Sequence, residues 1–154
     1  MNIYFDLDGT LADFYSVNNW LQKILENDSS PYREARPLHN FSYLAKLMHK
    51  CQKKGIEFSI ISWGSKNSTE NFLSAVADEK RKWLKTHLPS VNFSEIIIVP
   101  YGTPKENYKN SQFDILFDDE QANRKNWKNG AFEPQYIIPI LKHICGSCLM
   151  LCGC

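Results

Sequence analysis

The chain alternates between short apolar runs and longer segments in which apolar residues recur every three or four positions. Four runs have the length and character of buried strands: Asn2–Phe5, Ile56–Ser62, Glu95–Val99 and Phe113–Phe117. Five segments have helical spacing: Phe14–Glu26, Phe41–Lys53, Ala75–His87, Glu120–Lys128 and Pro134–Ile144. Strands that alternate with helices indicate a parallel sheet flanked by helices. We therefore predict an α/β fold, a three-layer α/β/α Rossmann-like domain with a mostly parallel central sheet.

The remaining polar stretches are predicted to be loops, because they are rich in turn-forming residues. They are Asp28–Asn40, Gly64–Thr69 and Gly102–Ser111, the last with one helical turn. A chain of 154 residues without an internal repeat or a linker suits one compact domain. We predict this domain over residues 1–144, followed by a cysteine-rich tail over residues 145–154.

The charge balance and the first residues bear on whether the protein binds nucleic acid, is secreted or enters a membrane. Eighteen basic residues against 17 acidic ones give no basic face, so nucleic acid is not an expected partner. The basic run is read as the solvated face of a helix: Lys80, Arg81, Lys82 and Lys85. The chain shows neither a signal peptide nor an apolar run of membrane-spanning length. We therefore expect a cytoplasmic protein without a membrane partner.

Four of the five cysteines crowd the tail: Cys145, Cys148, Cys152 and Cys154. Thiolates at these intervals could hold Zn²⁺, but structural zinc sites usually draw their ligands from two separate segments. The alternative, which we prefer, is a poorly ordered tail that is sensitive to oxidation.

Acidic residues follow the first predicted strand and the last one. Asp6 and Asp8 stand two positions apart, and Gly9 after them permits a sharp turn. Asp118 and Asp119 follow the strand that ends at Phe117. Since ligands of parallel sheets sit beyond the carboxyl ends of the strands, we expect these carboxylates to meet. Like charges at close range are costly without a cation, and Mg²⁺ prefers oxygen ligands.

Two further polar residues complete this edge of the sheet. Ser62 ends the second predicted strand, and Lys105 lies in the loop after the third, with Lys109 as the alternative lysine. A phosphate dianion would bring oxygens that a metal, an ammonium and a hydroxyl can share. One carboxylate can then attack phosphorus, and a second carboxyl can protonate the leaving oxygen.

These residues resemble the four signature motifs of the haloacid dehalogenase superfamily of phosphohydrolases, in the family order, over roughly residues 1 to 130. The resemblance implies that Asp6 is the nucleophile and a metal ligand. It implies that Asp8 is the general acid/base, with its backbone carbonyl on the metal. It also implies that Ser62 and Lys105 hold the phosphate, while Asp118 and Asp119 belong to the Mg²⁺ site.

Within that superfamily the chain looks most like the 5′(3′)-deoxyribonucleotidases, through stretches that include 78–84 and 115–120. Those enzymes carry a larger helical cap, whereas here only a minimal cap within about 14–40 is expected. The resemblance implies a Mg²⁺-dependent phosphatase of a small phosphorylated substrate, such as a nucleoside monophosphate. The alternatives are a phosphatase of a phosphorylated macromolecule, such as a polynucleotide end, and a non-catalytic binding module.

Overall fold

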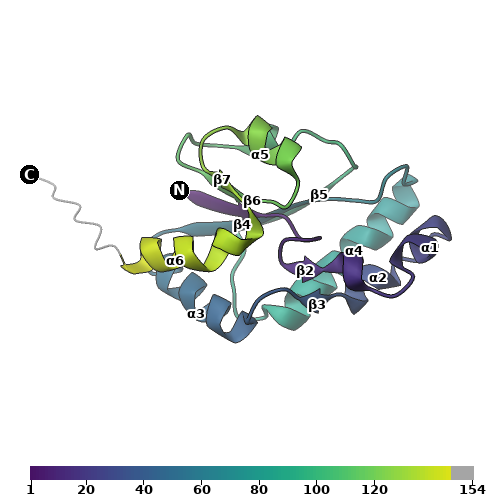
Figure 1. Ribbon diagram of the computed structural model, residues 1–154, viewed down its shortest axis with the longest axis horizontal. Helices are drawn as coiled ribbons and strands as arrows, with labels where there is room; N and C mark the ends of the chain where they lie inside the picture. Colours follow the sequence, from purple (N-terminus) through teal and green to yellow (C-terminus); the bar gives the residue numbers. More distant parts are fainter. Residues whose placement is uncertain (147–154) are drawn as a thin grey trace, which may run out of the picture.

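A five-stranded parallel sheet lies at the centre of the computed structural model, which describes residues 1–146 (Figure 1). The strand order is β5-β4-β1-β6-β7, and every pairing is parallel. The strands are β1 (Asn2–Phe5), β4 (Glu57–Trp63), β5 (Glu95–Val99), β6 (Ile115–Phe117) and β7 (Ala131–Phe132). The α/β class and the parallel sheet predicted from the sequence are confirmed. The two-residue β7 was not predicted, because so short a strand carries no periodic pattern.

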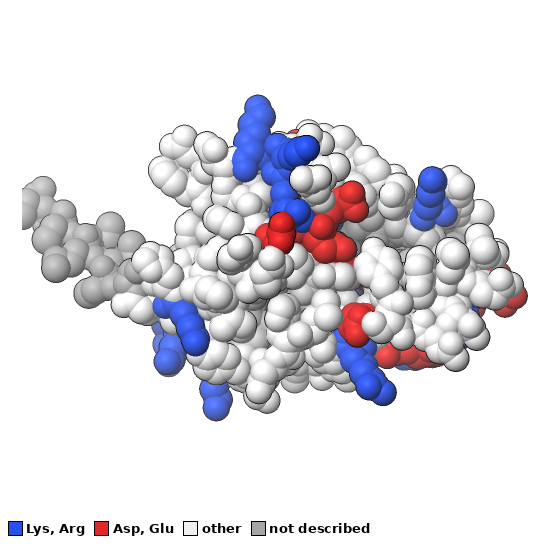
Figure 2. All heavy atoms as spheres, in the orientation of Figure 1, with Lys and Arg blue, Asp and Glu red and all other residues white. Residues whose placement is uncertain are grey.

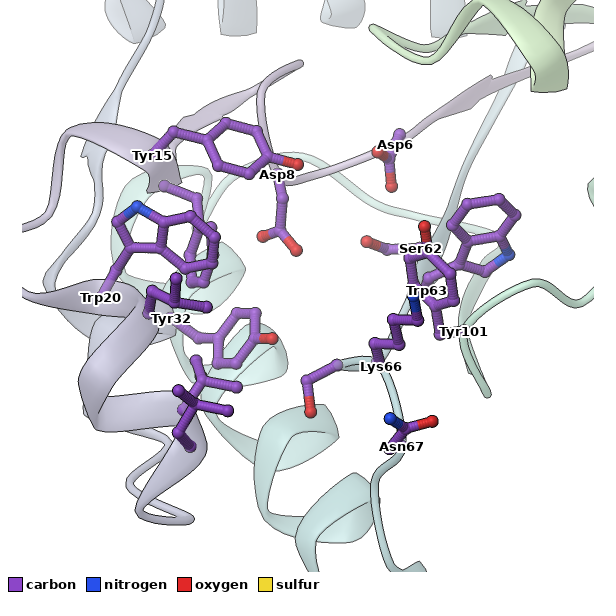
Figure 3. A pocket seen from close by; sticks show the side chains of 16 residues that line it. Asp6, Asp8, Tyr15, Trp20, Tyr32, Ser62, Trp63, Lys66, Asn67 and Tyr101 are labelled. Carbon is purple, nitrogen blue, oxygen red and sulfur yellow. The ribbon is translucent and has the colours of Figure 1, made fainter.

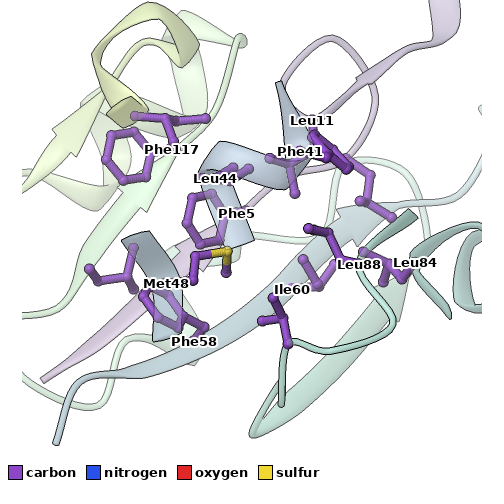
Figure 4. Close-up of a cluster of buried hydrophobic side chains, with 14 of the residues drawn as sticks. Phe5, Leu11, Phe41, Leu44, Met48, Phe58, Ile60, Leu84, Leu88 and Phe117 are labelled. Carbon is purple, nitrogen blue, oxygen red and sulfur yellow. The ribbon is translucent and has the colours of Figure 1, made fainter. Parts of the chain in front are cut away.

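Helices cover both faces of the sheet. The larger hydrophobic core joins one face to three helices: α3 (Phe41–Gln52), α4 (Glu70–His87) and α6 (Ile137–Gly146) (Figure 4). The smaller core joins the other face to α5 (Gln121–Trp127) and the short helix η2 (Lys105–Tyr108). Side chains of a strand point alternately to the two faces, and both faces of a parallel sheet are normally buried. The helices therefore form the two outer layers.

β1 lies in the middle of the sheet and contributes to both cores. Ile3 and Phe5 belong to the larger core, whereas Tyr4 belongs to the smaller one. The Phe5 ring stacks on the Phe117 ring of β6, with the ring centroids 5.4 Å apart. This packing fixes the end of β1 beside the end of β6.

Helix α4 begins five residues before the predicted start at Ala75. Thr69 is its N-cap, since the Thr69 side-chain oxygen accepts a hydrogen bond from the Phe72 amide at 3.2 Å. Such a cap satisfies an amide that has no partner within the helix. The helix thus reaches back to the loop that follows β4.

The 14–40 segment differs most from expectation. The predicted helix over Phe14–Glu26 is confirmed only in its second half, because the chain forms η1 (Phe14–Ser16) and then α1 (Trp20–Leu25). Asn19 separates them with a left-handed φ of 55°, a conformation that asparagine tolerates. The predicted loop over Asp28–Asn40 is wrong. It contains α2 (Ser30–Glu34) and β3 (Arg36–Pro37), which pairs with β2 (Ala12–Asp13).

Aromatic side chains hold the 14–40 segment on helix α4. The rings of Phe14 and Tyr32 stack with centroids 4.6 Å apart, and Trp20 lies 5.2 Å from Phe14. Phe14 and Tyr32 share a buried cluster with Phe72 and Val76 of α4. Figure 1 shows α1 and α2 beside α4. The segment occupies the part of the chain where we expected a minimal cap.

Helix α6 ends at Gly146, the last residue that the structure describes. None of the helices within residues 1–146 has the length and hydropathy needed to cross a membrane. Cys148, Cys152 and Cys154, on which the zinc alternative depends, lie outside the described residues. Cys145 lies in α6 and packs against the larger core, which contains Cys51.

Candidate active site

The predicted polar residues gather at the carboxyl edge of the sheet. Asp6 directly follows β1, Ser62 lies near the end of β4, and Asp118 and Asp119 directly follow β6. The Asp6 amide donates a hydrogen bond to the Phe117 carbonyl at 2.9 Å, which joins the ends of β1 and β6. Parallel pairing in register therefore places residues from distant parts of the chain side by side.

Three carboxylates form the acidic cluster, defined as Asp6, Asp118 and Asp119. One carboxylate oxygen from each lies within 4.8 Å of the others. Burial and then repulsion by Asp6 raise the pKa of Asp118 to about 6. Partial burial, and then repulsion by Asp6 and Asp118, raise the pKa of the more exposed Asp119 to about 7. Figure 2 shows acidic side chains gathered near the middle of the visible face.

Lys105 is the cation that faces this cluster. The Lys105 ammonium lies 2.6 Å from Asp118 Oδ2 and 3.1 Å from Asp6 Oδ1. Burial alone lowers the pKa of Lys105, but attraction to Asp6 and Asp118 outweighs it and raises the pKa. Lys109, the alternative lysine, instead donates to the backbone carbonyls of Trp127 and Asn129. The structure thus brings Lys105, and not Lys109, into contact with the carboxylates.

The acidic cluster fits a divalent cation. Asp6 Oδ1 is buried and makes no hydrogen bond within residues 1–146, although the Lys105 ammonium lies near it. One ammonium cannot neutralise three ionised carboxylates. A cation held by Asp6, Asp118 and Asp119 would relieve that excess, and its all-oxygen ligand set is of the kind that hard ions prefer. The Asp8 carboxylate is not part of this cluster, so metal binding through the Asp8 backbone carbonyl stays a prediction.

Helix α5 orients Asp118 through contacts that the sequence did not reveal. The Asn123 amide group donates to both carboxylate oxygens of Asp118, at 3.3 and 3.1 Å. The Arg124 guanidinium donates to the backbone carbonyls of Asp118 and Asp119, at 2.8 and 2.7 Å. Arg124 thus braces the turn after β6.

The turn after Asp8 lies against the acidic cluster. Gly9 has a φ of 73°, and a Cβ atom there would lie 2.3 Å from Asp119 Oδ2. Thr10 Oγ1 accepts a hydrogen bond from the Asp119 amide at 3.1 Å. Glycine is therefore needed at position 9 both for the backbone conformation and for the close approach of Asp119.

Asp8 pairs with a different lysine, Lys80 of helix α4. The Lys80 ammonium lies 2.7 Å from Asp8 Oδ2, and Lys80 is 1% exposed. The prediction of a solvated basic face is therefore wrong for Lys80, although the side chains of Arg81 and Lys82 are 49% and 65% exposed. Burial raises the pKa of Asp8, and repulsion by Asp6 adds to it, whereas Lys80 opposes the shift.

A cavity of about 380 Å³ lies beside Asp6 and Asp8 (Figure 3). Asp6, Asp8 and Ser62 line one part of it, with polar atoms directed into the space. Apolar and aromatic side chains of the 14–40 segment form one wall: Phe14, Tyr15, Trp20, Leu21, Ile24, Leu25 and Tyr32. The opposite wall includes Trp63 and Tyr101, whose rings lie 4.9 Å apart.

The cavity offers the Asp6 carboxylate, the Asp8 carboxyl group and the Ser62 hydroxyl, and the buried Lys105 ammonium lies beside Asp6. Carboxylates beside a fixed cation suit attack on an anionic, electrophilic centre. None of the four histidines of the chain lines this cavity. A scan against protein-family models finds no match to this chain, and no curated protein matches it.

Proposed function

We propose that this chain is a Mg²⁺-dependent phosphatase that hydrolyses a phosphate monoester through an aspartyl-phosphate on Asp6. One observation carries the proposal: Lys105 contacts both Asp6 and Asp118, and Asp6 lines a cavity together with Asp8 and Ser62. These are the residue types and the chain order of the haloacid dehalogenase motifs that the sequence resembles. The geometry supports the roles that the resemblance implies.

In the first step, an oxygen of the Asp6 carboxylate forms a bond to phosphorus while the bond to the leaving oxygen breaks. The protonated Asp8 carboxyl group donates its proton to that leaving oxygen. The raised pKa of Asp8 favours the protonated form that this step requires. The alcohol then leaves the cavity, and the phosphoryl group remains on Asp6.

In the second step, Asp8 accepts a proton from a water molecule, whose oxygen attacks phosphorus. The bond between phosphorus and the Asp6 oxygen breaks, which releases inorganic phosphate and restores both carboxyl groups. Splitting hydrolysis into two displacements replaces one difficult step with two easier ones. Asp6 and Asp8 both line the cavity, as this exchange of roles requires.

Charge stabilisation comes from groups that are already in place. When bound at Asp6, Asp118 and Asp119, a Mg²⁺ ion would offset negative charge on the transferring phosphoryl group. Lys105, which is 1% exposed, holds its ammonium beside Asp6. The Ser62 hydroxyl, also in the cavity wall, is a donor for a phosphate oxygen. Donors that need no reorientation during the reaction are the most effective.

The cavity walls favour a substrate with a planar, apolar part. Aromatic rings occur on both walls, and rings of this kind stack on nucleobases. The volume of about 380 Å³ lies in the range of small-molecule sites, roughly 300–1,000 Å³. We therefore propose a nucleoside monophosphate as the substrate, which would make the chain a 5′-nucleotidase or deoxyribonucleotidase.

The test is a substrate panel assayed with Mg²⁺ and with a chelator, on wild type and on Asp6→Asn. We expect wild type to hydrolyse mononucleotides in the presence of Mg²⁺, and Asp6→Asn to lose about 10³-fold or more of that activity. Asp78→Asn, at an exposed site on α4, is the matched control. Faster hydrolysis of 5′-phosphorylated oligonucleotides would favour a macromolecular substrate. Inactive wild type would favour a binding module.

A further inference from the structure

Lys80 makes an unusually complete set of contacts for a lysine. Its ammonium donates hydrogen bonds to Asp8 Oδ2 at 2.7 Å, to Ser62 Oγ at 2.8 Å and to the Trp63 carbonyl at 2.6 Å. An ammonium has three donors, so all of them are used. The ammonium also lies 4.9 Å from the centre of the Tyr32 ring. Four neighbouring groups therefore hold the Lys80 ammonium in place.

These contacts join three separate parts of the fold. Asp8 belongs to the turn after β1, Ser62 and Trp63 belong to β4, and Tyr32 belongs to the 14–40 segment. Among these partners, only the Asp8 carboxylate carries a charge opposite to that of Lys80. A buried ammonium is costly without a charged partner, so the burial of Lys80 depends on its ion pair with Asp8.

The contact restrains Asp8 without occupying both of its oxygens. Asp8 Oδ2 accepts the hydrogen bond from Lys80, which leaves Oδ1 to carry the proton that the reaction transfers. Ser62 Oγ and the Trp63 carbonyl anchor the ammonium to the rigid end of β4. Asp8 lies in a turn, and a carboxylate on a turn needs such support to stay aligned.

We propose that Lys80 is a positioning residue that aligns the Asp8 carboxyl group with the leaving oxygen. The proposal rests on the phosphatase function proposed above. Lys80 does not itself bind the substrate in this geometry, because its three donors are taken. Its effect is therefore confined to the step in which Asp8 transfers a proton.

The test compares Lys80→Met with Lys82→Met, a matched control on the same helix whose side chain is 65% exposed. The readout is kcat/KM for a nucleoside monophosphate, whose leaving oxygen needs a proton, and for p-nitrophenyl phosphate, whose leaving oxygen does not. We expect Lys80→Met to lower the first value about 10²-fold and the second less than about tenfold. Lys82→Met should leave both unchanged. Equal losses with the two substrates would overturn the proposal.

A double-mutant cycle separates positioning from a merely structural role. If Lys80 acts through Asp8, adding Lys80→Met to Asp8→Asn should change kcat/KM for the nucleoside monophosphate less than about threefold. If Lys80→Met instead lowers kcat/KM by a further factor of about 10² in the Asp8→Asn variant, the proposal is overturned. Circular dichroism and thermal unfolding check the fold, and Lys80→Gln replaces Lys80→Met if the latter does not fold. Inactive wild type would instead contradict the phosphatase function.

Discussion

The Lys105 ammonium lies 2.6 Å from Asp118 Oδ2, and the side chains of the two residues are 1% and 0% exposed. A buried cation of η2 is therefore paired with a buried carboxylate at the end of β6. The same ammonium lies 3.1 Å from Asp6 Oδ1, so it also joins the end of β1. This shared contact holds the two strand ends together despite the repulsion between their carboxylates.

Replacing Lys105 with methionine should therefore reduce both stability and activity. Removing one member of a buried ion pair leaves the carboxylates uncompensated, which costs about 3–5 kcal/mol. We expect a lower free energy of unfolding by urea denaturation and a loss of phosphatase activity of about 10²-fold or more. Added Mg²⁺ should recover part of the stability, because it binds only the folded site.

Lys109→Met is the control for this experiment. Lys109 lies in the same loop, but its ammonium donates to the backbone carbonyls of Trp127 and Asn129 and lies over the Trp127 ring. We expect it to keep the activity of wild type. Equal loss of activity in the two variants would show that the assignment of Lys105 is wrong.

The acidic cluster should make the metal-free protein less stable as the pH rises. The pKa of Asp118 is raised from 3.8 to about 6 and that of Asp119 from 3.8 to about 7. Between about pH 4 and pH 7 the folded state therefore binds more protons than the unfolded state. The free energy of unfolding contributed by these groups falls over that window.

Thermal melts in chelator and in Mg²⁺ between about pH 5 and pH 8 measure this effect, a range that extends about one unit beyond the raised values on each side. Protons and Mg²⁺ compete for the same oxygens, so the increase in Tm caused by Mg²⁺ should grow with pH. Asp119→Asn should flatten the profile in chelator. A Mg²⁺ effect that is equal at both ends of the range would contradict the prediction.

Gly9→Ala should weaken metal binding more than it weakens the fold. A Cβ atom at Gly9 would lie 2.3 Å from Asp119 Oδ2, so Asp119 must move. Gly102→Ala is the matched control, because Gly102 has a φ of 85° but nothing within 4 Å of its added Cβ. Both variants carry backbone strain of about 1–2 kcal/mol. Calorimetric titration with Mg²⁺ should show weaker binding for Gly9→Ala alone.

Tyr101→Ala should raise KM for substrates with an aromatic base. Tyr101 is 54% exposed and lines the cavity opposite the 14–40 segment. Loss of one stacking ring should raise KM for a nucleoside monophosphate about tenfold, since such contacts are worth ~1–3 kcal/mol. KM for glycerol phosphate should not change. Tyr136→Ala, at a similarly exposed tyrosine outside the cavity, should affect neither substrate.

The strand ends could be predicted from the sequence because each depends on local pattern. Apolar runs identify β1 and β6, and the polar residues that end them, Asp6 and Asp118, must then share one edge of a parallel sheet. Lys80 could not be recognised in the same way. Its helical position beside Val76 and Trp83 indicates the buried face, but a lysine is buried only when a distant partner such as Asp8 is present.

The 14–40 segment shows a second limit of local pattern. The spacing of apolar residues over Phe14–Glu26 suggested one helix, but stacking between Phe14 and Tyr32 requires the chain to double back. Arg36 and Pro37, which suggested a loop, instead pair with β2 as an edge strand. Both features depend on contacts between residues that are far apart in the chain, and no single window of sequence contains them.

The central place of β1 has a consequence during protein synthesis. Asp6 and Asp8 leave the ribosome before the strands that flank β1, which come from residues 57–60 and 115–117. A nascent chain that ends before β6 contains Asp6 and Asp8 but lacks Asp118 and Asp119. We therefore expect it neither to bind a divalent ion at this site nor to hydrolyse an ester. Under the proposed function, chemistry would therefore begin only once β6 has been synthesised.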